Sequence, residues 1–250
     1  LEIVTGTNEY HQDLPFITFA YALHADGNNH PGGPFVTGWP TAVIGLLSAV
    51  VPYMGDGLTM TPQLLDLEGD GAMEIAVAGP GGAPTLFAGD GKVLVEMACD
   101  ESGWGEDRDT KEFGALPYLA NLAVGDVDLD GDPDLVAGMT AARWGLSLLL
   151  NRWIPYQDHL VAVWDARTGL ALEAWPRVIE DISMFVKPAI SDISGDGLPE
   201  VIMSSGGYAV HAWNADGIEA PGWPQAGQTL NTGSDIRCST SCAWPQFEQR

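Results

Sequence analysis

The sequence has little positive charge. It contains 10 lysine and arginine residues against 34 aspartate and glutamate residues, so its formal net charge is −24 at pH 7 with histidine neutral. A chain this acidic is repelled by the phosphates of nucleic acids and by anionic lipid surfaces. We therefore expect neither nucleic acid nor a membrane surface as a partner.

Long apolar runs are also lacking, and cysteines are few. No stretch reaches the roughly 18 uninterrupted apolar residues of a membrane-spanning helix, so we expect no membrane insertion. The three cysteines say little about the fold. Cys238 and Cys242 lie close enough in sequence to form a local disulfide, which would indicate an oxidising compartment. Cys99 is interpreted as a small core residue.

Signatures of enzymes are missing. The sequence has no G-x-S-x-G nucleophile elbow, no H-E-x-x-H zinc motif, no C-x-x-C-H haem motif and no Walker loop. Its five histidines are dispersed along the chain. The sequence therefore favours a role that is not itself catalytic.

Glycine and proline, by contrast, are plentiful. The chain has 31 glycines and 17 prolines, and they are scattered along it. Helices of average length rarely accommodate so many, whereas short strands joined by tight turns use them. With 250 residues and 46% hydrophobic residues, the chain can bury a substantial core. We predict an all-β fold and a single domain over residues 1–250.

An acidic motif occurs three times. It reads D-x-[DES]-x-D-G-x-x-[DE], begins at Asp66, Asp126 and Asp192, and precedes a strand-like apolar run each time. Residues 1–6 match the end of the same unit, as a fourth copy without its loop. The spacing predicts repeat units at roughly 1–60, 61–120, 121–186 and 187–250.

Two further markers recur in the same register. Apolar strands end in Asp-Gly or Thr-Gly at residues 26–27, 90–91, 168–169 and 216–217. These pairs indicate β-hairpins, and we expect type I′ turns with positive φ at both central positions. Trp-Pro pairs stand at residues 39–40, 175–176, 223–224 and 244–245. In the second repeat the acidic stretch 100–112 takes the place of Trp-Pro, and we expect a solvated loop there. Several short strands per repeat predict propeller blades.

The acidic motif has the oxygen chemistry of a calcium site. Calcium takes 6–8 oxygen ligands, which positions 1, 3 and 5, the carbonyl of position 7 and the carboxylate at position 9 can supply. An EF-hand closes with Glu at position 12, where this sequence has Val77, Ala137 and Met203. The motif therefore predicts calcium loops that are not EF-hands. The alternative is that the loops are only solvated acidic turns.

The motif and its markers resemble FG-GAP (VCBS) repeats, known from integrin α-subunit propellers and from bacterial secreted or surface proteins. The resemblance extends over nearly the whole chain. It implies about four visible blades, which a partner or the remainder of a longer polypeptide would complete to a ring of commonly seven. It also implies about three Ca²⁺ ions, held by Asp66, Glu68, Asp70, Glu74 and the Ala72 carbonyl; by Asp126, Asp128, Asp130, Asp134 and the Asp132 carbonyl; and by Asp192, Ser194, Asp196, Glu200 and the Leu198 carbonyl.

Ser194 supplies no carboxylate, so the charge count predicts that the third site is the weakest. The long interval before the third hairpin predicts a projecting insert at residues 139–158. Arginine and aromatic residues are frequent binding hot spots, and they make this insert a candidate partner-binding surface, with Arg143, Trp144, Arg152, Trp153 and Tyr156. The alternative is that the insert buries these rings against its own blade.

The expected function is a calcium-stabilised binding or assembly module, for adhesion or protein–protein interaction. The resemblance places it outside the cell, at the cell surface or in the periplasm. Two alternatives stay open. One is a glycan-binding lectin in which Trp39, Trp175 and Trp223 stack on sugars, and the other is the propeller part of a secreted polysaccharide hydrolase, lyase or quinoprotein.

Overall fold

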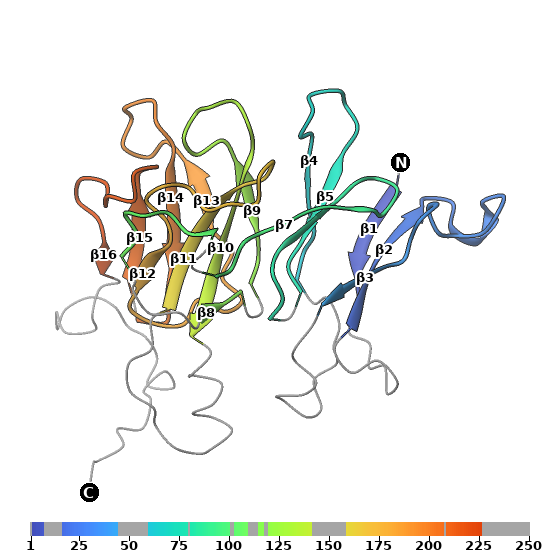
Figure 1. The fold of residues 1–250 in the computed structure, drawn as a ribbon, viewed down its shortest axis with the longest axis horizontal. Helices are drawn as coiled ribbons and strands as arrows, with labels where there is room; N and C mark the ends of the chain where they lie inside the picture. Colours follow the sequence, from blue (N-terminus) through green and yellow to red (C-terminus); the bar gives the residue numbers. More distant parts are fainter. Residues whose placement is uncertain are drawn as a thin grey trace, which may run out of the picture.

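The computed structural model contains four antiparallel β-sheets arranged side by side (Figure 1). It describes residues 2–7, 17–44, 60–79, 81–100, 103–109, 115–117, 120–141, 159–207 and 209–226. In these residues the one helix is the 3₁₀ turn η1 (Gly27–Asn29), and no helix is long and apolar enough to cross a membrane. The prediction of an all-β fold is confirmed.

Three of the sheets contain a four-stranded meander. The first has the order β4 (Gln63–Leu65), β5 (Glu74–Val77), β6 (Thr85–Phe87) and β7 (Val93–Glu96). The next runs β9 (Ala123–Gly125), β10 (Asp134–Ala141), β11 (His159–Asp165) and β12 (Arg177–Ile179). The last runs β13 (Ala189–Ser191), β14 (Glu200–Ser204), β15 (Ala209–Trp213) and β16 (Gln225–Ala226). Each meander has the topology of a propeller blade.

The remaining strands complete this arrangement. A three-stranded sheet is formed by β1 (Glu2–Gly6), β2 (Ile17–His24) and β3 (Thr41–Ile44). The short strand β8 (Ala115–Leu116) pairs with the far end of β10. Strand β9 contacts both β4 and β13, so the first strands of three successive blades lie next to one another.

Three apolar clusters hold neighbouring blades together. The largest includes Leu86 of one blade with Leu160 and Trp164 of the next, all fully buried. A second cluster lies between the β9–β12 blade and the β13–β16 blade, and a third lies between the three-stranded sheet described above and the β4–β7 blade. Strands β10 and β11 are buried on both faces because both have a neighbouring blade, which explains their nearly continuous apolar sequences. Cys99 packs at the edge of the largest cluster, and burial raises the pKa of its thiol to about 12.

Tryptophans of the Trp-Pro pairs link one blade to the next. The indole N–H of Trp39 donates to the carbonyl of Gly89 at 2.9 Å, and that of Trp175 donates to the carbonyl of Ala215 at 2.9 Å. Both acceptors lie in the hairpin turn of the following blade. Trp39 and Trp175 are only 6% and 0% exposed. They therefore offer no open ring face to a sugar, and the lectin hypothesis is wrong for these two residues.

The hairpins stand at the predicted positions, but their turns are of a different type. In the β6–β7 hairpin Gly91 has φ +81°, and its N–H donates to Ala88; the β15–β16 hairpin repeats this with Gly217. The aspartate before each glycine is not among the residues with positive φ. The pattern is a type I turn followed by a left-handed glycine, so the expectation of type I′ turns is wrong.

The acidic stretch of the second blade is only partly solvated. Residues 103–105 are buried, and Trp104 is 7% exposed. The Gly105 N–H donates to the Trp175 carbonyl, and the Ala171 N–H donates to the Gly103 carbonyl. This segment therefore fills the interface with the next blade by backbone hydrogen bonds, which its high charge conceals in the sequence. The expectation of a solvated loop is wrong for residues 103–105.

Candidate metal centres

The three acidic motifs form loops at one end of the sheets. Residues 66–74 join β4 to β5, residues 126–134 join β9 to β10, and residues 192–200 join β13 to β14. Figure 1 shows these loops on the same side of the molecule. Each loop leaves the first strand of its blade and returns into the second, so the blades present equivalent loops in equivalent positions.

The loops share one set of hydrogen bonds. The first Asp accepts from the N–H of the glycine at position 6, the Asp at position 5 accepts from the N–H of position 7, and the acid at position 9 accepts from the N–H of position 2. These bonds are 2.7 to 3.1 Å long, and the backbone donors are Gly71, Ala72, Leu67; Gly131, Asp132, Val127; and Gly197, Leu198, Ile193. The carboxylates thus fold the loop around themselves.

Two positions in each loop have left-handed backbone. Position 6 is always glycine, with φ between +85° and +98°. Position 4 has φ of +70° at Gly69 and +79° at Gly195, whereas in the second loop it is Leu129 with φ +60°. The sequence motif treats position 4 as variable, but the fold requires left-handed backbone there.

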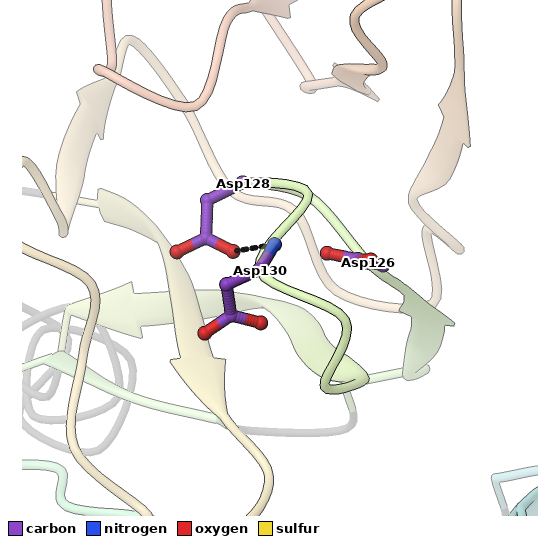
Figure 2. A group of neighbouring side chains, drawn as sticks. All are labelled: Asp126, Asp128 and Asp130. Carbon is purple, nitrogen blue, oxygen red and sulfur yellow. Dashed lines mark hydrogen bonds between the residues drawn. The ribbon is translucent and has the colours of Figure 1, made fainter.

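The second loop brings three predicted ligands together. Oxygens of Asp126, Asp128 and Asp130 lie within 4.8 Å of one another (Figure 2). The Asp130 N–H donates to Asp128 Oδ1 at 3.2 Å. Burial raises the pKa of Asp128, and the neighbouring Asp130 and Asp126 carboxylates raise it further. Asp126 Oδ1 is buried and has no hydrogen-bond partner. The three carboxylates therefore converge with one buried oxygen that has no hydrogen-bond partner among the described residues.

The acid that closes this loop is almost fully buried. Asp134 is 1% exposed, and it accepts the N–H of Val127 at 2.7 Å. Burial raises the pKa of Asp134 to about 7, with further increases from Asp128, Asp130 and Asp165. An ionised carboxylate in this position needs compensating charge.

Asp165 is an acidic neighbour that the sequence motif does not contain. It stands opposite Asp134 in the β10–β11 register, and it forms a second acidic group with Asp130 and Asp132. The corresponding positions in the neighbouring blades are Ala88 and Asn214. Asp165 could have been found from the sequence by pairing the two strands of the hairpin and reading the residue opposite the acid at position 9.

In the third loop, oxygens of Asp192, Asp196 and Glu200 lie within 4.8 Å of one another. Glu200 is 0% exposed. Its Oε2 accepts the N–H groups of Ile193 and Ser194 at 2.7 and 3.3 Å, whereas its Oε1 is buried without a hydrogen-bond partner. One oxygen of this fully buried carboxylate therefore has no hydrogen-bond partner among the described residues.

The first loop differs, although the structure describes all of residues 66–74. Its four acids form no group of three with oxygens within 4.8 Å. Both Asp66 oxygens accept backbone N–H groups, and Glu74 Oε2 accepts the Leu67 N–H. Glu68 is paired with Arg167 at 3.0 Å. Here at least one oxygen of each acid accepts a donor of the protein itself.

The donor set fits a hard divalent cation in the second and third loops. All the candidate ligands are oxygens, which calcium prefers in flexible cages. A buried acceptor without a partner costs about 1–3 kcal/mol, and more when it is charged. A cation in each loop would satisfy Asp126 Oδ1 or Glu200 Oε1 together with the surrounding carboxylates.

Some residues singled out in the sequence lie outside the described part of the chain. They are the predicted partner-binding residues Arg143, Trp144, Arg152, Trp153 and Tyr156, and the pair Cys238 and Cys242.

Comparison with known proteins identifies the repeat. A family model described as FG-GAP-like repeat matches residues 66–137, which contain the first and second acidic loops. One similar solved structure is the quinohemoprotein alcohol dehydrogenase ADHIIG from Pseudomonas putida HK5, with 14% identity and a TM-score of 0.40. The match covers 80% of this chain and 30% of that one, so this chain spans well under half of that enzyme's length. No curated protein sequence matches the chain. The chain therefore carries an FG-GAP-like repeat at residues 66–137 within an all-β architecture of propeller blades.

Proposed function

We propose that the chain is a calcium-stabilised propeller module that binds or assembles with another protein outside the cell. The observation that carries the calcium part is the fully buried Glu200, whose Oε1 has no partner beside Asp192 and Asp196. Asp126 Oδ1 repeats this feature in the second loop. When bound, calcium supplies charge neutralisation and oxygen coordination, and the loop residues hold it at the end of the blades.

The electrostatics of the chain support the same proposal. Carboxylates within a few ångströms repel one another strongly at low effective dielectric. The three groups of three acids, two of which share Asp130, lie in a protein whose net charge is already −24. Solvated turns avoid such repulsion by pointing their acids into water, but Glu200 and Asp134 are buried. Burial together with repulsion favours a bound cation over the alternative of solvated acidic turns.

A melting experiment tests the calcium part. Calcium at about 100 times its dissociation constant stabilises the folded state by about 2.7 kcal/mol per site. This corresponds to an increase in Tm of at least about 5 °C for a chain of this size. Circular dichroism melts in 2 mM calcium and in EDTA should differ by this amount. Equal melting curves in the two buffers would refute calcium stabilisation.

Two matched variants assign the effect to the third loop. Glu200→Gln removes the buried charge, and we expect it to reduce the gain in Tm on adding calcium. Asp216→Asn removes the same unit of charge from a hairpin turn, where the Asp216 side chain accepts the Ile218 N–H, and we expect the full gain to persist. A similar loss in both variants would mean that net charge, not a site, sets the response.

The binding part rests on the propeller architecture and on the sequence of the insert 139–158. The strands on either side of residues 142–158, β10 and β11, are buried, and loops carried by a rigid scaffold often hold binding residues. Immobilised wild-type protein should capture a secreted or surface protein in calcium, and Trp144→Ala with Trp153→Ala should abolish capture without lowering Tm. Unchanged capture by the double variant would exclude these two tryptophans as the contact.

An enzymatic propeller is the competing function. A redox quinoprotein carries a bound organic chromophore and oxidises its substrate, and a polysaccharide hydrolase or lyase shortens glycans. The absorption spectrum of the purified protein and its activity on glycans distinguish both from a binding module.

A further inference from the structure

Arg167 joins two acidic loops that belong to different blades. It lies in the turn between β11 and β12, and its Nε and Nη2 donate to Asp132 Oδ2 and Oδ1 at 3.0 and 2.8 Å. Its Nη1 donates to Glu68 Oε1 at 3.0 Å, and Nη2 also donates to the Leu67 carbonyl at 2.9 Å. One guanidinium therefore contacts the second loop through Nε and Nη2 and the first loop through Nη1 and Nη2.

This contact explains why the first loop differs from the other two. Glu68 stands at position 3, where the second loop has Asp128 within its acidic group. Glu68 instead forms an ion pair with Arg167 of the neighbouring blade. Within the described residues, no buried side-chain oxygen of the first loop is left without a hydrogen-bond partner, in contrast to Asp126 and Glu200.

We propose that Arg167 acts as an internal cation that competes with calcium for Glu68, so that the first loop binds calcium more weakly than the second and third. This inference rests on the proposed function, because it concerns calcium affinity at the same loops. Calcium at the first loop and the Arg167–Glu68 pair require the same carboxylate, so each lowers the stability of the other. The order of affinities departs from the charge count alone, which ranks the third loop last because of Ser194.

The competition is modest in size and depends on salt. The side chains of Arg167 and Glu68 are 41% and 60% exposed, and ion pairs this exposed contribute little in water. The paired fork to Asp132 keeps the guanidinium in place when Glu68 leaves it. We therefore expect Arg167 to lower the calcium affinity of the first loop about two- to fivefold, and less in high salt.

Calcium titrations of wild type and three variants against a chromophoric chelator test the inference. Arg167→Gln should raise the affinity of the weakest site about two- to fivefold, and adding Glu68→Gln should abolish this gain. Lys187→Gln is the matched control, because it removes one positive charge near the other end of β4, where Lys187 donates to Gln63 at 3.2 Å. It should leave the weakest site unchanged.

Melting curves provide a second readout. In EDTA, Arg167→Gln should melt at a lower temperature than wild type because it loses the link between blades, but calcium should raise its Tm by more. Arg167→Lys keeps the charge without the fork and should lie between the two proteins, which gives a test if the glutamine variant does not fold.

The outcomes separate the two proposals. If calcium binds but Arg167→Gln titrates like wild type, or if Lys187→Gln raises affinity equally, the role of Arg167 is refuted and calcium binding stands. If neither wild type nor Arg167→Gln binds calcium at millimolar concentration, the proposed function itself fails.

Discussion

At the scale of single residues, Asp134 gives the calcium-free protein a component of its pH response. Its pKa is raised to about 7 from an ordinary value of 3.8, mainly by burial. The folded state therefore holds this proton over a range in which the unfolded chain has lost it. For such a group, stability is highest below the unfolded pKa and is lost as pH rises towards the folded pKa.

We predict that the Tm in EDTA contains a component that falls between about pH 4 and pH 7 and that depends on Asp134. Asp134→Asn should remove this component, because asparagine does not titrate. The measurement is the difference in Tm between wild type and variant across the pH range, in EDTA throughout. A difference that is the same at every pH would show that Asp134 keeps an ordinary pKa in the fold.

Leu129 pays a conformational penalty at position 4 of the second loop. Its φ of +60° is left-handed, and its side chain is 52% exposed, so packing offsets little of the strain. Left-handed backbone costs an ordinary residue about 1–2 kcal/mol, and glycine avoids this cost. Glycine also makes the unfolded chain more flexible, which lowers the gain in stability by about 0.5–1 kcal/mol. We predict that Leu129→Gly raises the free energy of unfolding by about 0.5–1 kcal/mol in urea denaturation.

Leu129→Ala is the control for this prediction. It removes the same exposed side chain but keeps the β-carbon, so it should not stabilise the protein. Equal stabilisation by both variants would attribute the gain to the lost apolar surface instead of the backbone.

Residues of the loops could be found in the sequence, and their partners could not. Aspartates and glycines at fixed spacing mark each loop, because one loop needs its ligands and its turn within nine positions. Arg167 reaches Glu68 across 99 residues of sequence, and only the packing of two blades brings them together. No local pattern encodes such a contact, and the same holds for the indole N–H of Trp175 and its acceptor in the next blade.

At the scale of elements, the sequence predicted the strands and the sites of the hairpins. Apolar runs of a few residues between glycine-rich turns suffice for that. The turn type was wrong because Asp-Gly suits both a type I′ turn and a type I turn followed by a left-handed glycine. The sequence predicts solvent exposure for residues 103–105 because most of their neighbours in the stretch 100–112 are charged, and no local pattern marks the short buried segment.

The Trp-Pro pairs give a prediction at this scale. Trp175 is fully buried and donates to Ala215, whereas Trp223 is half-buried. Trp175→Phe leaves the Ala215 carbonyl without this donor and opens a small gap between blades, so it should lower the free energy of unfolding by about 2–3 kcal/mol. Trp223→Phe makes the same chemical change and should cost less than about 1 kcal/mol. Equal losses in urea denaturation would mean that the link between blades contributes no stability.

At the scale of the whole molecule, acidic loops of neighbouring blades gather at one end of the sheets (Figure 1). Blades with loops in equivalent positions accumulate charge there, because each blade adds several carboxylates and Arg167 offsets only part of them. The repulsion then acts across the interfaces between blades, against the apolar packing and the hydrogen bonds that hold them together. Cations at this end would lower the repulsion inside each loop and between the loops.

This argument predicts how salt and calcium combine. Sodium chloride screens exposed charges that lie farther apart than the Debye length, about 10 Å at 0.1 M and about 3 Å at 1 M, so it should raise the Tm of the calcium-free protein. With calcium bound, less repulsion is left to screen, and the same salt should raise the Tm by less. Melting curves at 0.05 and 0.5 M sodium chloride, each in EDTA and in 2 mM calcium, measure the difference between the two increments. If salt raises the Tm equally in both, calcium leaves the acidic end as repulsive as before, and stabilisation must arise from coordination inside single loops.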